Sequence, residues 1–123
     1  LDTEIVGVAA ERFPAYARSF ECGEVVVGAP AQSIADGMAV RGPDPTALAV
    51  LRAGASRVVE VSEEAIREAM RCVFSDTHNV AEGAGAAAVA AVAADRERLR
   101  EKRVAAVLSG GNVDAAVFAA VLA

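Results

Sequence analysis

The chain has 123 residues, of which 54% are hydrophobic, 4% aromatic and 24% charged, and its formal net charge at pH 7 is −5. This length allows one domain with a real core but is small for a complete α/β enzyme. The acidic balance argues against a nucleic-acid partner, which needs a basic face, and the longest apolar run, residues 84–94, is about half of the ~20 residues that a membrane span needs.

The first residues and the two cysteines predict where the protein is located and whether the chain is a fragment. The first residues lack the basic start of a signal peptide, which predicts a cytoplasmic protein. Because residue 1 is Leu rather than Met, we expect a processed chain, a trimmed chain or a fragment of a longer protein. Cys22 and Cys72 have neither metal-ligand spacing nor a disulfide framework, which predicts reduced, structural cysteines.

The first quarter of the chain predicts one strand and one helix. Residues 4–10 form an apolar run typical of a buried strand. A helix is expected to begin after Pro14, which suits a first turn, to run over residues 15–20 and to close at Gly23. Residues 24–28 predict a short extended piece.

The next segment contains local signals of a turn, a helix and a second strand. Asp36-Gly37 is a turn signal. Asp44 is expected to cap a helix that has Pro45 at its first position and ends at Gly54. Residues 57–61 then predict a strand.

Two more helices follow. Ser62 is expected to cap the first of them, and polar residues 75–79 are expected to break it. An Ala-rich helix is predicted from about residue 84 to 95, and the charge run 96–103 predicts a solvated helix end or loop. The predicted core stripe of the first helix recurs at helical spacing and comprises Ile66, Met70, Val73 and Phe74.

The last part of the chain has the most informative pattern. Residues 104–108 are apolar throughout, which predicts a parallel strand covered on both sides. Ser109, Gly110 and Gly111 then predict a sharp turn, and a helix is expected from residue 114 to the end. The alternation predicts a single α/β unit over residues 1–123, with a mainly parallel sheet and helices on both faces.

Polar groups are expected at the carboxyl ends of these segments, where open α/β sheets bind ligands. They are Glu11, Glu82 and Ser109. Two simpler interpretations stay open: the glycines after Ser109 only make a tight connection, and Glu82 only serves the positive end of its helix. The single histidine, His78, is interpreted as solvated or capping, because no nucleophile motif accompanies it.

Four stretches together resemble one family. They are the strand and Ser-Gly-Gly-Asn-Val-Asp turn of residues 104–114, the Ala-Asp-Gly segment of residues 34–40, the Glu-Gly-Ala-Gly-Ala-Ala helix start of residues 82–87, and the strand and loop of residues 6–15. Taken in chain order, the four stretches resemble the carboxyl-terminal part of the large domain of threonine and serine dehydratases. These are fold type II pyridoxal-phosphate (PLP) enzymes, and serine racemase is related to them.

The resemblance implies cofactor-binding roles. Ser109 would hydrogen-bond the pyridine nitrogen of PLP, and a hydroxyl, unlike a carboxylate, does not hold that nitrogen protonated. The ring is then a milder electron sink, which favours loss of a β-hydroxyl. Glu82 would lie beside the ring, and Gly37 and Gly110 would let the backbone approach the cofactor.

The resemblance also implies a cation site with Glu11 and the carbonyl of Ala15. The family usually has an acidic residue at the position of Ala17, so we expect at most a weak site here. The lysine that anchors PLP and the glycine-rich phosphate loop have no counterpart: Lys102, within the charge run, is the only lysine. No catalytic residue is therefore assigned, and we expect the chain to be inactive alone.

The function implied is that of a threonine dehydratase (L-threonine ammonia-lyase), which converts L-threonine to 2-oxobutanoate and ammonia. A serine racemase fragment, a 3-hydroxyaspartate dehydratase fragment and a non-catalytic α/β binding or assembly module stay open. The expected partners are a small amino-acid substrate in the intact enzyme and a missing N-terminal half. Without that half we expect self-association through an exposed apolar patch, and no nucleic-acid or membrane partner.

Overall fold

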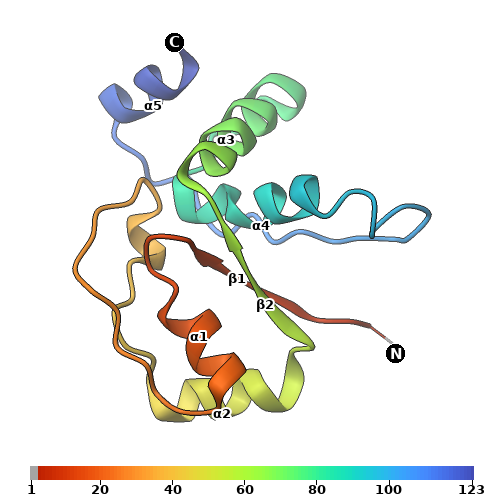
Figure 1. Cartoon of the computed structure of the whole chain (residues 1–123). Helices are drawn as coiled ribbons and strands as arrows, with labels where there is room; N and C mark the ends of the chain where they lie inside the picture. The colour runs from red at the N-terminus through yellow and green to blue at the C-terminus, as the bar shows by residue number, and fades with distance from the viewer. Residues whose placement is uncertain (1–2) are drawn as a thin grey trace.

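The computed structural model describes residues 3–123 and has a parallel pair of strands at its centre (Figure 1). In the pair, β1 (Val6–Ala10) lies beside β2 (Arg57–Val61), with Val6 opposite Arg57 and Ala10 opposite Val61. This register puts Val6, Val8 and Val59 on one face of the sheet, because alternate side chains point to opposite faces. The predicted parallel α/β arrangement is confirmed.

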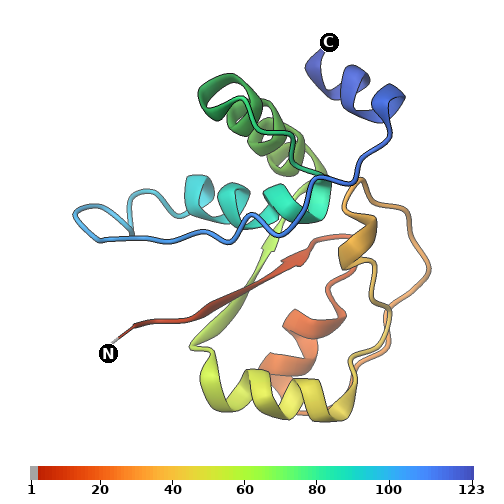
Figure 2. The same ribbon diagram turned by 180° about the vertical axis from the view of Figure 1, so that it is seen from behind.

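Helices cover both faces of the strand pair, as Figures 1 and 2 show from opposite sides. On one face lie α1 (Ala15–Cys22) and α2 (Pro45–Gly54). The other face is covered by α4 (Gly83–Ala94), which packs against α3 (Glu63–Thr77). Two shorter elements complete the chain: the 3-10 turn η1 (Asp36–Met38), which contacts α4, and α5 (Ala115–Leu122), which contacts α3.

The helices begin and end where the sequence predicts local caps. The Asp44 carboxylate accepts hydrogen bonds from the Thr46 and Ala47 amides, and Pro45 occupies the first turn of α2. The Ser62 hydroxyl accepts a hydrogen bond from the Ala65 amide. Gly23 closes α1 with φ 84°, a left-handed conformation that side chains other than glycine rarely adopt.

The main core lies between the sheet, α3 and α4. Ile66 and Met70 of α3 are fully buried, and the facing positions of α4 are alanines, which let the two helices approach closely. Phe74 is at the rim, where its ring meets that of Phe118 in α5 edge to face at 5.4 Å. Of the predicted stripe, Ile66, Met70 and Val73 are therefore core, whereas Phe74 is 36% exposed.

Two predictions about α3 and the last strand are wrong. The helix continues to Thr77 instead of breaking at residue 75, because the Ser75 and Thr77 hydroxyls donate to carbonyls one turn earlier and fit within the helix. Residues 104–108 are exposed, and no described residue pairs with them as a neighbouring strand. Their sequence suits a covered strand, but the covering layer is absent from residues 3–123.

No helix in the described part of the chain combines the length and apolarity needed to cross a membrane.

Candidate functional site

The first turn of α4 is where the predicted cofactor-binding residues meet. The turn η1 packs against α4, and the chain that follows residue 108 crosses the start of the same helix (Figure 2). The Glu82 amide donates a hydrogen bond of 3.1 Å to the Gly110 carbonyl. Gly37 lies on the other side, where a Cβ would be 3.1 Å from that of Ala84. Glu82, Gly37 and Gly110 therefore lie close together at the start of α4, and Ser109 is the next residue along.

Glycines make this convergence possible. A Cβ on Gly85 would collide with the Gly110 carbonyl oxygen, and a Cβ on Gly83 would collide with that of Ile34. On Gly111 it would lie 2.5 Å from the Val80 carbonyl oxygen. These contacts are with backbone, which cannot swing aside. Sequence reasoning did not single out Gly85, although its spacing after Gly83 in an otherwise alanine-rich helix is a usable signal.

Glu82 occupies the N-cap position of α4, yet its carboxylate makes no capping hydrogen bond. Instead Oε1 lies against Gly110, where a Cβ would collide with it. Among residues 3–123 no side chain or amide donates a hydrogen bond to this half-buried carboxylate. The carboxylate thus makes no capping hydrogen bond, but it lies at the N-terminus of α4, so the interpretation in which Glu82 only serves the positive end of its helix stays open.

Ser109 follows the extended segment 104–108 and is exposed. Its hydroxyl forms no hydrogen bond within the described residues, and it adjoins the Gly110 backbone that Glu82 contacts. The site thus contains the Ser109 hydroxyl and the Glu82 carboxylate, neither of which is hydrogen-bonded within the described residues. They lie beside backbone that glycine leaves without side chains. A planar ring with a polar edge suits such a surface, so these residues fit the PLP role that the sequence suggested.

The predicted cation ligands lie elsewhere. Glu11 follows β1, is exposed, and accepts a 3.3 Å hydrogen bond from the Glu63 amide at the start of α3. Ala15 is fully buried in α1, as is the neighbouring position Ala17. Within the described residues, no cluster of three or more His, Cys, Asp or Glu side chains could hold a metal ion. Any cation here would therefore depend on carbonyl oxygens and a single carboxylate.

Glu63 is a residue whose importance the sequence did not reveal. It is 7% exposed, and its carboxylate accepts hydrogen bonds from the Ser33 hydroxyl and, at 3.0 Å, from the Ile34 amide. Arg67, one turn along α3, lies 3.8 Å from the same carboxylate. These bonds hold the backbone of residues 33–34, which lead into η1. The Ile34 carbonyl in turn lies against Gly83. Glu63 thus positions one wall of the site from the start of α3.

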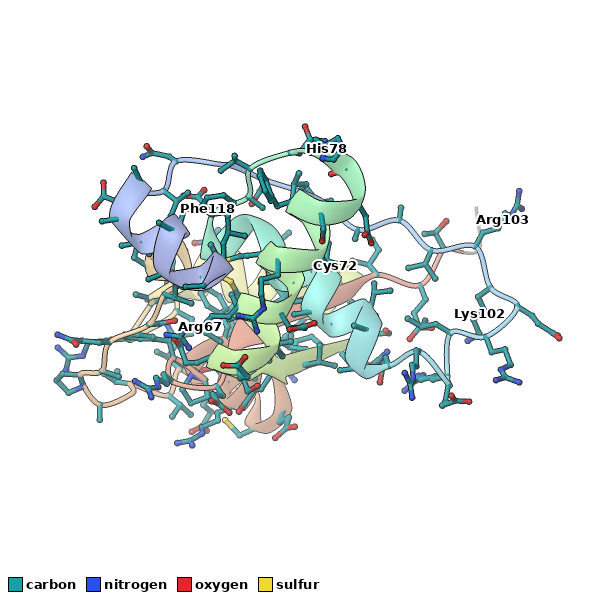
Figure 3. The ribbon with its side chains drawn as sticks, turned by 90° about the horizontal axis from the view of Figure 1, so that it is seen from above. Arg67, Cys72, His78, Lys102, Arg103 and Phe118 are labelled. Carbon is teal, nitrogen blue, oxygen red and sulfur yellow. The ribbon has the colours of Figure 1, made fainter. Side chains whose placement is uncertain are left out.

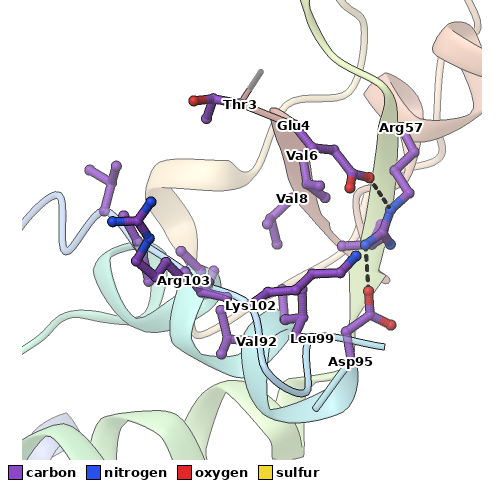
Figure 4. A pocket seen from close by; sticks show the side chains of 18 of the residues that line it. Thr3, Glu4, Val6, Val8, Arg57, Val92, Asp95, Leu99, Lys102 and Arg103 are labelled. Carbon is purple, nitrogen blue, oxygen red and sulfur yellow. Dashed lines mark hydrogen bonds and ion pairs between the residues drawn. The ribbon is translucent and has the colours of Figure 1, made fainter. Parts of the chain in front are cut away.

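A cavity of about 1020 Å³ lies beside the site, between β1, α4 and residues 104–107 (Figure 4). Its far end is polar. Arg57 pairs there with Asp95 at 2.5 Å and with Glu4 at 3.5 Å. The hydrogen bond from the Ser56 hydroxyl, together with the charges of Arg98 and Arg57, lowers the pKa of the exposed Glu4 carboxyl, and desolvation opposes this shift.

Lys102 lies at that polar end, at the tip of a long loop (Figure 3). Seven residues of extended chain separate it from Ser109, which corresponds to at most about 25 Å.

Two other predicted features have no part in the site. His78 ends α3 in the left-handed conformation, with φ 57°, and its amide donates to the Phe74 carbonyl, so the capping interpretation is confirmed (Figure 3). Cys22 and Cys72 are free, and both are exposed rather than part of the core.

Comparisons with known proteins identify a family and several relatives. A family model described as "Pyridoxal-phosphate dependent enzyme" matches residues 1–110. L-threonine ammonia-lyase of Thermotoga maritima is 36% identical over 92% of this chain and 28% of its own length. Phenylserine dehydratase of Ralstonia pickettii is 37% identical over 94% of this chain and 36% of its own length.

The fold matches a solved enzyme as well. A threonine deaminase from T.th. superimposes with a TM-score of 0.85 and 36% identity, covering 91% of this chain and 41% of that one. The chain thus spans about a third of the length of the curated relatives it matches.

Proposed function

Because the chain belongs to the family of pyridoxal-phosphate dependent enzymes, we propose that it forms one side of the cofactor site in an ammonia-lyase that acts on β-hydroxy amino acids. The observation that carries the proposal is the meeting of Glu82, Gly110 and the adjoining Ser109 at the start of α4. The two curated relatives described above are named for L-threonine and phenylserine, both β-hydroxy amino acids. L-threonine is the substrate we propose first.

The chain's own residues have distinct tasks in this proposal. The Ser109 hydroxyl hydrogen-bonds the ring nitrogen without keeping it protonated. Glu82 lies beside the ring with a carboxylate that has no other bonding partner among the described residues, and Gly37 and Gly110 let the backbone reach it. When bound, PLP supplies an electron sink for the carbanion formed at the amino acid's α-carbon. The moderate sink set by Ser109 favours departure of the β-hydroxyl.

The anchoring amine must come from outside these residues, since Lys102 lies at the opposite end of the cavity. We therefore propose that this chain alone does not turn over threonine. Self-association through an exposed apolar patch and a cytoplasmic location are also part of the proposal. The apolar, exposed character of Val107 and Leu108 supports the first of these.

The weak cation site with Glu11 and the Ala15 carbonyl is a separate proposal. Glu11 already accepts a hydrogen bond from the Glu63 amide, and a cation would share that carboxylate. Thermal unfolding with and without Mg²⁺ or K⁺ tests it. A shift in Tm that disappears in Glu11→Gln supports the site, and no shift with either ion rejects it.

The activity is tested by joining this chain to the part of the T. maritima L-threonine ammonia-lyase that it does not match. We expect PLP-dependent formation of 2-oxobutanoate from L-threonine, with a large fall in kcat in Ser109→Ala. Ser75→Ala, on the exposed end of α3, is the matched control and leaves kcat unchanged. A joined protein that folds and binds PLP but releases no ammonia from threonine or phenylserine would favour a non-catalytic module or a racemase.

A further inference from the structure

A second cavity, of about 410 Å³, lies where residues 32–34 meet the first two turns of α3 and one face of α5. Its polar residues come from parts of the chain that are far apart in sequence: Arg12 follows β1, Ser33 precedes η1, and Glu63 and Arg67 belong to α3. Arg67 lies on α3 beside α5 (Figure 3). The residues that have a task in the proposed function do not line this cavity.

Two guanidinium groups with unused donors line the cavity. Arg12 donates one hydrogen bond, of 3.2 Å from Nη1 to the Gln32 carbonyl, which holds its side chain beside the loop. Arg67 lies 3.8 Å from the Glu63 carboxylate, which is too long for a hydrogen bond, and its guanidinium donates to no described residue. Because a guanidinium carries several N–H donors, most donors of this pair are free to bind an acceptor.

The carboxylate in the lining is already bonded. One Glu63 oxygen accepts a hydrogen bond from the Ser33 hydroxyl, and the other accepts one of 3.0 Å from the Ile34 amide. At 7% exposed, Glu63 presents little surface to a ligand. Two arginines and one glutamate give the lining a net charge of +1, so the free donors favour an anion.

The α5 side of the cavity is apolar. Val117, Ala120 and Val121 stand at positions i, i+3 and i+4, so they share one face of the helix. Ile34 adds a further aliphatic residue to the lining. This surface suits a short hydrocarbon chain and gives no hydrogen bond to a bare inorganic anion. A fitting ligand therefore has an anionic head and an apolar tail.

We propose that this cavity binds a small aliphatic carboxylate. Its oxygens accept hydrogen bonds from the Arg12 and Arg67 guanidinium groups, whose planar forks match a carboxylate, and its hydrocarbon chain lies on α5. The ligand also lies against Ile34, whose amide is held by Glu63. The site does not depend on the proposed lyase function.

The probe is butanoate, titrated into the chain and followed by NMR. We expect saturable binding with a dissociation constant on the order of 1 mM, as is reasonable for so small a ligand. The Nε–H signals of Arg12 and Arg67 and the amide signal of Ile34 should shift along one saturation curve. No saturation well above that concentration, or shifts confined to other residues, would overturn the proposal.

Three further probes separate the head of the ligand from its tail. Butanamide keeps the tail without the charge, and acetate keeps the charge with almost no tail. We expect each to bind about tenfold more weakly than butanoate, because one loses the charge-assisted hydrogen bonds and the other the apolar contact. Equal affinity for butanamide would exclude an anion site, and equal affinity for acetate or inorganic phosphate would exclude a role for the α5 surface.

Neutral variants test the two arginines. Arg12→Gln and Arg67→Gln should each weaken butanoate binding about tenfold. Arg18→Gln is the matched control, because Arg18 is exposed on α1, lies outside the lining, and makes no side-chain hydrogen bond or ion pair with a described residue. If Arg67→Gln does not fold, the exposed Arg12 still decides the test. An equal effect of all three substitutions would indicate only long-range attraction and would contradict the site.

The cavity must also be open in the whole enzyme, since the chain spans about a third of the length of its curated relatives. The chain joined to the unmatched part of the T. maritima enzyme is therefore titrated with butanoate by calorimetry. Binding that Arg12→Gln weakens about tenfold would support the proposal. No binding, or binding that Arg12→Gln leaves unchanged, would overturn it. A joined protein that binds butanoate but does not turn over threonine would contradict only the lyase function.

Discussion

The amide of Glu82 donates to the carbonyl of Gly110, and the Glu82 carboxylate lies against the Gly110 Cα. This pair joins the start of α4 to the chain that follows residues 104–108, two parts of the sequence that are far apart. It brings the one unbonded carboxylate of the described site next to Ser109. The arrangement is possible because no side chain stands between them.

The close contact at Gly85 predicts a stability cost. In Gly85→Ala the new methyl meets the Gly110 carbonyl oxygen, so the backbone must move, which costs about 1–3 kcal/mol as overpacking usually does. Gly54→Ala is the matched control, because it ends α2 with nothing within 4 Å of a Cβ. That change is expected to be neutral or to stabilise by up to about 1 kcal/mol. Urea unfolding measures both, and equal effects would contradict the tight contact.

Substitution of Glu63 is also expected to lower the free energy of unfolding, independently of Gly85. Glu63→Ala leaves the Ser33 hydroxyl and the Ile34 amide without their acceptor, which lowers the free energy of unfolding by about 1–3 kcal/mol. Glu64→Ala, whose side chain is 74% exposed, should change it by less than about 0.5 kcal/mol. Hydrogen exchange at Ile34 should accelerate only in Glu63→Ala. An unchanged rate there would exclude the positioning role.

The ion cluster around Glu4 predicts a pH dependence. The pKa of Glu4 is lowered in the folded chain, chiefly by the Ser56 hydroxyl, so its contribution to stability is present above the unfolded pKa and is lost as the pH falls through the folded one. Glu4→Gln should therefore be less stable than the parent near pH 7, and the difference should shrink on acidification. Glu21→Gln is the control, since Glu21 has no ion pair within residues 3–123. A difference that is constant with pH would refute the linkage.

The two cysteines should differ in reactivity. A hydrogen bond of 3.2 Å to Asp76, together with its negative charge, raises the pKa of the Cys72 thiol (Figure 3). Less thiolate is present at mildly alkaline pH, so alkylation of Cys72 by iodoacetamide is slow. Asp76→Asn should accelerate it several-fold, measured by peptide mass spectrometry with Cys22 as internal reference. No acceleration would show that Asp76 does not control the thiol.

Local chemistry explains which elements the sequence could predict. The Asp44-Pro45 start, the Ser62 cap and the Gly23 end each depend on a few neighbouring residues, and all three are found as expected. Residues 104–108 were misjudged because their burial depends on a neighbouring layer rather than on their own pattern. The extension of α3 to Thr77 was missed because helix-compatible hydroxyl bonds are not visible in composition.

The same distinction between local and tertiary signals applies to the residues of the candidate site. Glu82, Ser109, Gly110 and Gly37 were predicted from motifs that a family resemblance joined, and the fold brings their segments together. The role of Glu63 was not predicted, because its bonds to Ser33 and Ile34 cross about 30 residues of sequence. Tertiary hydrogen bonds of this kind leave no periodic signal.

The central claim is that the Ser109 hydroxyl meets the ring nitrogen of PLP and leaves it unprotonated. The most direct measurement is the ¹⁵N chemical shift of ring-labelled PLP bound to the joined enzyme, in the parent and in Ser109→Asp. The account predicts an unprotonated nitrogen in the parent and a protonated one in the variant, because only a carboxylate stabilises the pyridinium charge. The same shift in both proteins would contradict it.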